Sequence, residues 1–436
     1  MSHQKNLNVH LLFASTLEKI AICQWLLSLW EMFPAELPRQ VGRVVWLRCD
    51  DTAKALLRSI KKLRDSDPWE YQLSGEDRVR FRRRDGLGTL VIQLPPMLAE
   101  WGLDSHSDDD CLSAINAYQG LFGVDVIYNP SGTGLRALRA DYARNGRSER
   151  LAPPKKTLEP FKTHGPQALT WIRPLADDEK GRRWLAAFDK SASYLRASDV
   201  YCGVGDYDWC RTVDCASLDV RWASQQPGVW RLGGPPVQFH GLEIQLENRW
   251  FYTPMLKWLA ATTDLFYVLE GYYFSERAQI FRRWREKMLP IADGDKCALR
   301  SMCKATYTRS FGLLCSEFLA KQNDQLYRPD WRGQVIEEAA ARMLWNIEKV
   351  YQALKLSPVA IYDDCLFYAI DDMRLAGLMV GASGFLPQFK VKGVYDLSAA
   401  LDAGLFNDTI QTFITREWSD SDARGIEYFR VGGDEQ

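Results

Sequence analysis

The chain has 436 residues, of which 46% are apolar and 12% aromatic, and its formal net charge is −1. This length and composition predict a globular protein of two or three domains and exclude a disordered chain. The near-zero charge gives no overall basic field that would announce a nucleic-acid partner, although residues 78–85, 144–156 and 277–287 are local basic patches. Each patch taken alone is typical of a solvated face.

Residues 1–30 lack the basic start, apolar run and small-residue cleavage site of a signal peptide. No window approaches the ~18 apolar residues of a membrane-spanning helix, so we expect a cytoplasmic protein without a membrane partner. The ten cysteines include no CxxC pair. Cys202, Cys210 and Cys215 come closest to a cluster, but a zinc site there lacks a fourth ligand, so buried free thiols are the preferred interpretation.

Residues 1–143 alternate strand-like and helix-like patterns, which predicts an α/β N-terminal domain. The expected order is strand, helix, strand, helix, at residues 42–49, 50–63, 88–94 and 107–123. The first helix has Asp50 or Asp51 as its N-cap. The acidic start of the second helix, Asp108–Asp110, suits the positive end of a helix dipole. Residues 144–167 are rich in Arg, Lys, Pro and Gly, which predicts a linker.

Beyond the linker, a mixed region extends to about residue 270. Three helices are then expected, at residues 275–289, 296–312 and 332–356, the first two joined by a turn. The next segment, residues 357–370, has the pattern of two short apolar strands with Asp363 and Asp364 at the turn between them. Two carboxylates at the tip of a buried hairpin indicate that this turn has a chemical role.

Three segments carry the chemistry jointly. In LAAFDKSASY an apolar strand ends at Asp189, and Tyr194 follows five residues later. The segment KATYTRSFG lies in the helix expected over residues 296–312, and it begins with Lys304 and ends with Phe311 and Gly312. The third segment is the aspartate hairpin. Each pattern alone is common in long proteins, whereas the ordered set on a strand end, a helix and a hairpin is more specific.

The ordered set resembles the polymerase core of family B DNA polymerases, most nearly the small protein-primed branch, over about residues 180–400. The first family motif reads Asp, any two residues, Ser, Leu, Tyr, and its Asp-to-Tyr spacing matches Asp189 and Tyr194. The second motif reads Lys, any three residues, Asn, any two residues, Tyr, Gly, and matches the helix that begins at Lys304. The third motif, a hairpin with two aspartates, follows in the family order.

The third motif is degenerate in this chain. The family has Tyr, any residue, Asp, Thr, Asp, Ser, whereas IYDDC places Asp363 and Asp364 next to each other. We align the catalytic aspartate with Asp364, because the apolar return strand follows it, and Asp363 stays an alternative. In the other two motifs, Thr308 stands at the Asn position and Leu195 replaces the usual Pro.

The resemblance implies an α/β (α+β) fold: a right-hand polymerase palm with small fingers and thumb, preceded by an exonuclease-like α/β domain. The implied boundaries are residues 1–143 for the N-terminal domain, 144–167 for the linker, 168–270 and 313–385 for the palm, 271–312 for the fingers, and 386–436 for a small thumb or C-terminal region. The strands expected in the N-terminal domain contain no Asp-x-Glu pair to hold the two metals of a proofreading nuclease. No exonuclease activity is therefore expected.

The implied function is template-directed DNA synthesis without proofreading, in the replication of a linear plasmid or mobile element. The implied partners are a DNA template-primer and dNTPs, and a terminal or primer protein is a further candidate. Nucleotidyl transfer needs an activated 3′-hydroxyl and a neutralised pyrophosphate, which two Mg²⁺ ions about 3.5–4 Å apart provide. Mg²⁺ is typically held by one or two carboxylates. Asp189 and Asp364 are thus the expected ligands of Mg²⁺ or Mn²⁺, and without a cation their charges would repel.

The triphosphate also needs positive charge from the protein. Lys304 and Arg300 are four residues apart on one helix face, and Lys296 is one further turn back. Three cations on one stripe suit a polyphosphate clamp, and the resemblance implies that Lys304 contacts the incoming nucleotide. A solvated basic face is the alternative interpretation.

The resemblance implies roles for five more residues. Tyr194 would lie under the sugar and select deoxynucleotides, although a plain core position is the simpler interpretation. Phe311 and Gly312 would let the helix approach the nascent base pair, because glycine permits close backbone approach. Lys390 and Lys392 in FKVKGVY resemble the family's KxY element that holds the primer strand, and a plain edge strand is an equal alternative.

Two other functions remain open at this point. The degenerate third motif and the even net charge are compatible with a catalytically weakened protein that binds a DNA end or a partner. The sequence IYDD also suggests a reverse-transcriptase-like hairpin, but the helix that begins with lysine argues against that class.

Overall fold

The computed structural model describes strand residues 10–13, 42–48, 69–73, 78–83 and 89–93, and then residues 95–397 apart from 127–128, 167–168, 213–216, 323 and 381–383. The chain divides into two compact units, Met1–Ser148 with Glu286–Leu313, and Glu149–Arg285 with Leu314–Gln436. The helix expected over residues 50–63 and the tail beyond residue 397 lie outside the described residues. The prediction of a mixed α/β fold is confirmed in both units.

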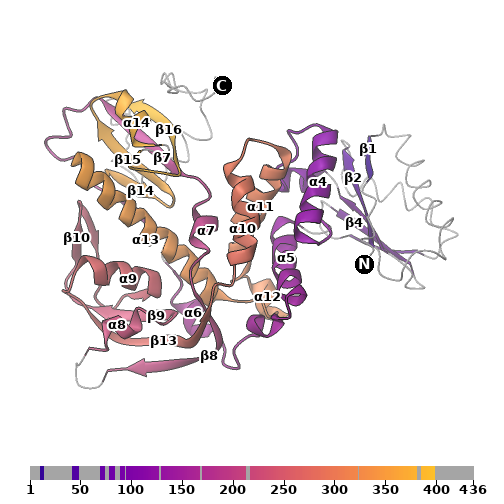
Figure 1. Cartoon of the computed structure of the whole chain (residues 1–436), viewed down its shortest axis with the longest axis horizontal. Coiled ribbons are helices and arrows are strands. Elements are labelled where there is room, and N and C mark those ends of the chain that lie inside the picture. The colour runs from indigo at the N-terminus through magenta and orange to yellow at the C-terminus, as the bar shows by residue number, and fades with distance from the viewer. Residues whose placement is uncertain are drawn as a thin grey trace. The chain divides into compact units, whose positions relative to one another are not determined.

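The first unit contains a mixed five-stranded sheet of order β1-β2-β5-β4-β3 (Figure 1). Its strands are β1 (His10–Phe13), β2 (Gly42–Arg48), β3 (Trp69–Leu73), β4 (Arg78–Arg83) and β5 (Thr89–Gln93). β1, β2 and β5 are parallel, and β4 is antiparallel to both β5 and β3. The strands expected at residues 42–49 and 88–94 are confirmed as β2 and β5, whose continuous apolar runs are typical of parallel strands.

Helices described in the first unit are α3 (Pro95–Glu100), α4 (Asp108–Phe122), α5 (Pro130–Arg144) and α11 (Ala298–Leu313). α10 (Arg282–Asp293) crosses the boundary between the units. The expected start of α4 is confirmed, because the Ser107 side chain accepts a hydrogen bond from the Asp110 amide and three aspartates fill the first turn. The helix ends at Gly123, whose φ of 63° lies in the left-handed region.

Helix α11 packs against α4 and α5. The Tyr118 hydroxyl lies 3.1 Å from Thr306 Oγ1, and both side chains are buried. Gly134 of α5 allows the helices to approach closely, because a Cβ there would collide with Ser310 Oγ and lie 2.6 Å from Thr306 Cγ2. This packing fixes which face of α11 is buried and leaves Lys304 exposed on another.

The second unit contains an antiparallel five-stranded sheet of order β16-β7-β15-β14-β6. Its strands are β6 (Thr170–Ile172), β7 (Trp184–Lys190), β14 (Ala360–Tyr362), β15 (Cys365–Ile370) and β16 (Phe389–Asp396). β7 lies between β15 and β16. The expected hairpin is confirmed as β14 and β15, with Asp363 and Asp364 as its turn. The first expected strand of this region is β7, and it ends one residue beyond Asp189.

A second antiparallel sheet of this unit has the order β12-β9-β13-β8. Its strands are β8 (Cys202–Arg211), β9 (Gly228–Gly233), β12 (Trp250–Tyr252) and β13 (Tyr267–Ala278), and a small hairpin is formed by β10 (Val237–Phe239) and β11 (Leu242–Ile244). The helix expected over residues 275–289 begins only at Arg282. The residues before it extend β13 instead, because Glu276, Arg277 and Ala278 pair with β8.

The long helix α13 (Pro329–Leu354) runs past both sheets of the second unit (Figure 1). The main hydrophobic core contains Phe188 and Tyr368 from one sheet, Trp230 from the other, and Leu344 from the helix. The start of α13 is also tied to β8, since the Arg328 guanidinium and the Trp331 indole each donate a hydrogen bond of 2.8 Å to the Gly203 carbonyl. Helix α13 therefore packs in a hydrophobic core that both sheets share.

Shorter helices complete the second unit: η1 (Ser148–Leu151), α6 (Glu159–Thr163), α7 (Ser193–Ala197), α8 (Val220–Ala223), α9 (Thr253–Thr262), α12 (Glu317–Lys321) and α14 (Met373–Met379). The segment expected as a linker, residues 144–167, thus carries helical turns. Phe161 is fully buried beside Tyr207, Tyr252 and Phe274, which holds the segment against the second sheet. Among the described residues, no helix is long and apolar enough to cross a membrane.

Gly134→Ala is expected to lower the melting temperature of the protein. The added methyl group enters a closed contact between α5 and α11, and overpacking of this kind typically costs about 1–3 kcal/mol. Gly120→Ala in α4 is the matched control, because no described atom lies within 4 Å of its Cβ position, and alanine there should leave stability unchanged or raise it by up to ~1 kcal/mol. Thermal unfolding of both variants checks the expectation, and equal melting temperatures would contradict the described packing of α11.

Candidate functional site

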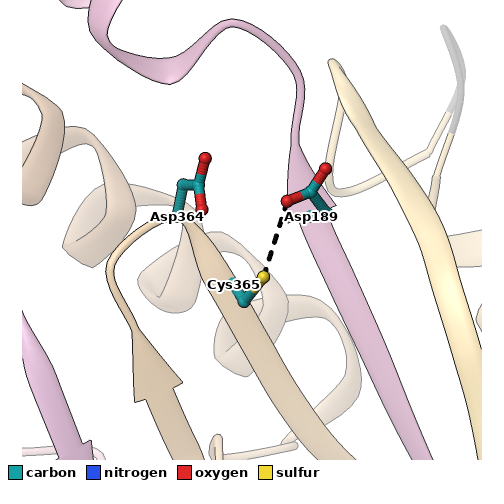
Figure 2. A group of neighbouring side chains, drawn as sticks. All are labelled: Asp189, Asp364 and Cys365. Carbon is teal, nitrogen blue, oxygen red and sulfur yellow. Dashed lines mark hydrogen bonds between the residues drawn. The ribbon is translucent and has the colours of Figure 1, made fainter. Parts of the chain in front are cut away.

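The pairing of β7 with β15 brings three potential metal ligands together at one end of the sheet. Cys365 is the cross-strand partner of Asp189, and Asp364 immediately precedes it in the turn. The three donor atoms, two carboxylate oxygens and the Cys365 sulfur, all lie within 4.8 Å of one another. Figure 2 shows the two carboxylates on either side of the gap between the strands, with the sulfur below them. Two residues distant in sequence from Asp189 thus complete one cluster.

The turn between β14 and β15 distinguishes the two adjacent aspartates. Asp363 has a φ of 51°, and Asp is among the few residues that tolerate this left-handed conformation. Its amide donates a hydrogen bond of 3.1 Å to the Leu169 carbonyl, and the carbonyl of Asp364 accepts one of 2.9 Å from the Lys190 amide. Turn conformation is therefore sufficient to explain an aspartate at 363, whereas the Asp364 side chain belongs to the three-donor cluster.

Burial and like charge make the cluster electrostatically unfavourable without a cation. Burial, followed by the neighbouring charge of Asp189, raises the pKa of the Asp364 carboxyl from 3.8 to about 6. Burial and the same aspartate raise the pKa of the Cys365 thiol to about 12. The thiol lies 3.5 Å from Asp189 Oδ1 and points its sulfur at that oxygen (Figure 2). A bound divalent cation would relieve both effects.

Two lysines of the edge strand β16 face the cluster. Lys390 is the cross-strand partner of Asp189 on the side opposite Cys365, and its Nζ forms an ion pair of 2.9 Å with Asp189 Oδ2. Lys392 Nζ lies 3.9 Å from Cys365 Sγ. FKVKGVY is thus an edge strand whose lysines face the cluster.

Helix α7 holds Tyr194 near the two aspartates. The half-buried phenol has its pKa raised to about 12, first by burial and then by the charges of Asp363 and Asp364. The helix is anchored from α13, because Arg342 donates a hydrogen bond of 2.8 Å to the Arg196 carbonyl. Tyr194 is therefore in the same unit as the cluster and within electrostatic range of it.

Lys190, which the sequence analysis did not single out, places a second charge at the end of β7. Side chains alternate along a strand, so Lys190 points to the face opposite Asp189. It is 4% exposed, and burial, followed by the charges of Arg342 and Arg196, lowers its pKa to about 8. The end of this strand thus carries an ionisable group on each face.

The predicted nucleotide-binding residues lie on α11 in the first unit. Lys304 is exposed and Arg300 half-buried on the helix, but Lys296 lies two residues before the helix begins and therefore does not extend the stripe. Phe311 is 3% exposed, and no described atom lies within 4 Å of a Cβ position at Gly312. The structure thus describes this group and the carboxylate cluster in different units.

Cys365 is the cluster member that sequence reasoning missed. The sequence IYDDC held a clue, because the residue that follows a two-residue turn is the first residue of the return strand and pairs with residues of the neighbouring strands. Assigning it required the strand partner, which the pattern alone does not give. The other cysteine group weighed earlier does not assemble within the described residues: Cys202 and Cys210 are eight residues apart on β8, a span of about 27 Å.

The donor set fits a divalent cation. Carboxylate oxygens from Asp189 and Asp364 are the ligands that Mg²⁺ and Mn²⁺ prefer. The raised pKa of Asp364 and the cationic partner of Asp189 are what a carboxylate pair requires when no metal neutralises it. The residues at this strand end can therefore hold a metal ion.

No protein-family model and no curated protein matches the chain. Among solved structures, the chain is similar to phi29 DNA polymerase in an orthorhombic crystal form, with 12% identity, a TM-score of 0.47, and coverage of 85% of this chain and 78% of that one. It is also similar to phi29 DNA polymerase complexed with primer-template DNA and incoming nucleotide substrates, with 12% identity, a TM-score of 0.49, and coverage of 85% and 79%. Similarity at this level assigns no family, so the function must come from the chain's own side chains.

Asp364→Asn is expected to stabilise the metal-free protein above pH 7. The folded-state pKa of about 6 exceeds the ordinary 3.8, so ionised Asp364 destabilises the fold by about 1–3 kcal/mol. The gain should shrink as the pH falls through 6 and vanish below about 4, where the wild-type carboxyl is protonated in both states. Denaturant titrations at pH 4, 6 and 8 measure it.

The control for this experiment is Asp371→Asn, because Asp371 is exposed at the far end of β15. It should change stability by less than about 0.5 kcal/mol at each pH. A loss of stability in Asp364→Asn at pH 8 would show that its carboxylate is not under strain in the folded protein.

Proposed function

We propose that the protein is a DNA-directed DNA polymerase that extends a primer by two-metal nucleotidyl transfer. The observation that supports this proposal is that Asp189 and Asp364, at the ends of neighbouring strands, bring carboxylate oxygens within 4.8 Å of each other. In this proposal the first sheet of the second unit is the palm, and the helix α11 belongs to the fingers.

The roles of the chain's residues follow from their positions. Bound Mg²⁺ or Mn²⁺ would supply Lewis-acid activation of the 3′-hydroxyl and charge for the leaving pyrophosphate. Asp189 and Asp364 hold and orient the cations, while Asp363 fixes the turn that aims Asp364. Lys390 neutralises Asp189 through their ion pair, and with a cation bound at Asp189 it would be free to contact a phosphate of the primer strand, together with Lys392.

Nucleotide selection falls to α7 and α11. Lys304 and Arg300 contact the triphosphate from one face of α11, whereas Lys296 lies before the helix and outside this pair. Tyr194, which α7 carries within electrostatic range of the aspartates, lies under the sugar and excludes a 2′-hydroxyl. Phe311 and Gly312 shape the surface that approaches the base pair.

The proposed polymerase has no proofreading activity. The described strands β1, β2, β4 and β5 contain no Asp or Glu, and β3 contains only Glu70. A nuclease of the two-metal type requires several carboxylates that converge. The proposed partners are a DNA template-primer and dNTPs, with a primer protein as an additional partner and a linear plasmid or mobile element as the setting.

A second candidate function is binding of a DNA end or partner without catalysis. The ion pair between Lys390 and Asp189 favours it, because a permanent lysine partner would hold the carboxylate away from metal. The two functions predict different results. A catalyst incorporates dNTP and loses this activity when either carboxylate is replaced, whereas a binding protein shows no incorporation as wild type or as a variant.

Asp189→Asn and Asp364→Asn are each expected to lower Mg²⁺- or Mn²⁺-dependent dNTP incorporation by about 10²–10³-fold or more, because each removes a ligand of the cations that would stabilise the transition state. Asp363→Asn and the exposed control Asp371→Asn should stay within about tenfold of the wild type. Primer extension on DNA and RNA templates measures this and separates a DNA-directed from an RNA-directed enzyme. Absence of incorporation by the wild type on DNA-primed and protein-primed templates would favour the binding function.

Lys304→Ala is expected to raise the KM for dNTP by about 10–100-fold, because a charged partner of the triphosphate is worth about 1.5–3 kcal/mol. Lys296→Ala is the matched control and should change KM by less than about threefold, since Lys296 lies outside the helical stripe. Steady-state kinetics at saturating template-primer provide the measurement. Equal effects of the two substitutions on KM would contradict the proposed triphosphate contact of Lys304 on α11.

A further inference from the structure

We propose that Cys365 is a third metal ligand, so that Asp189, Asp364 and Cys365 form a site for a thiophilic divalent cation of the Zn²⁺ class. The proposal rests on the proposed function only in sharing the two carboxylates, and it goes beyond that function in assigning the thiol and a different metal. A hard ion such as Mg²⁺ would use the carboxylates alone, whereas Zn²⁺, Cd²⁺ or Co²⁺ would use all three donors.

The distance between the thiol and the carboxylate matches the geometry of a zinc site. Cys365 Sγ lies 3.5 Å from Asp189 Oδ1. In a tetrahedral Zn²⁺ site, with Zn–S near 2.3 Å and Zn–O near 2.0 Å, a sulfur and an oxygen ligand are separated by about 3.5 Å. The Asp364 oxygen completes a set of three donors within 4.8 Å. Two of the three ligand positions are thus already at the required spacing.

The backbone holds this arrangement. Cys365 and Asp189 are directly opposed in the antiparallel pair of β15 and β7, so their side chains share one face of the sheet. Cys365 is 3% exposed and packs beside Phe367 and Ala187, which limits its rotation. Ligands supplied by a rigid sheet lose little conformational entropy on binding.

The charges around the thiol are compatible with its role as a ligand. Lys392 Nζ, at 3.9 Å, favours a thiolate against the opposing effects of burial and Asp189, and Lys390 forms an ion pair with Asp189 that a cation would replace. Binding replaces the thiol proton: the S–H bond breaks, the sulfur donates its electron pair to the cation, and the proton leaves to solvent. Three protein ligands leave one position open for water or a phosphate oxygen, as in catalytic rather than structural zinc sites.

A consequence is competition between metals. A cation that gains the thiolate binds the site more tightly than Mg²⁺, and it holds Asp189 and Asp364 in a tetrahedral arrangement that octahedral Mg²⁺ does not adopt. Low concentrations of Zn²⁺ should therefore displace Mg²⁺ from the carboxylates. Cys365 would determine which metal the site retains.

The test compares binding of Cd²⁺ and Zn²⁺ to the metal-free full chain in the wild type, Cys365→Ser and Cys303→Ser, the last being a buried cysteine of α11 as control. On addition of Cd²⁺, the wild type and Cys303→Ser should show the ultraviolet charge-transfer band of a cadmium thiolate. The part of this band that comes from Cys365 should be absent in Cys365→Ser. Loss of an outer-shell partner already costs metal sites about 10–100-fold in affinity, so removal of a direct ligand in Cys365→Ser should lower Zn²⁺ affinity by at least about 100-fold. Mg²⁺ affinity should be unchanged.

Retention of the band or of Zn²⁺ affinity in Cys365→Ser overturns the proposal, as does a band that disappears in Cys303→Ser. If Cys365→Ser does not fold, Asp189→Asn replaces it, because loss of a second ligand must also weaken Cd²⁺ binding by at least about tenfold. The readout is independent of polymerase activity. A wild type that binds Cd²⁺ through Cys365 but incorporates no dNTP would refute the proposed function and leave this inference intact.

Discussion

Backbone hydrogen bonds between β7 and β15 place Cys365 directly opposite Asp189 and set Asp364 one residue away at the turn. Every feature of the site depends on this register. A slip of one residue would turn Asp189 toward the core that contains Phe188 and Tyr368, and would move Lys190 to the opposite face of the sheet. Because both faces of the sheet are covered, the register is specified by packing, and the chemistry at the strand end follows from it.

The parts of this arrangement that are local in sequence could be predicted from it. The apolar runs of the strands and the two-residue turn could be inferred, because hairpins and strand ends have local patterns. The convergence of Asp189 and Asp364 was expected from the order of the motifs in the family that the chain resembles, not from a local pattern. The participation of Cys365 and the ion pair of Lys390 with Asp189 could not be inferred, since both depend on which strands become neighbours. The extension of β13 through Ala278 was missed for the same reason: ladder partners from β8 outweigh a helix-like pattern.

The cluster of Asp189, Asp364 and Cys365 brings negative charge together where burial and like charge disfavour it. Two carboxylates and a thiol meet in a partly buried position, and the chain compensates with lysines from the edge strand. Edge strands are the natural source of such cations, because their outer side is free to carry long charged side chains. The lysines of β16 thus both protect an exposed edge and balance the acidic strand end.

The helix α13 has a mechanical implication. Its buried side chains fill the space under both antiparallel sheets, and Arg328 and Trp331 fasten its first turn to β8. Shear between the two sheets would open a densely filled interior, at a cost that grows with every side chain exposed. Bending between the two sheets is therefore expected to be costly, so this unit should behave as one rigid body.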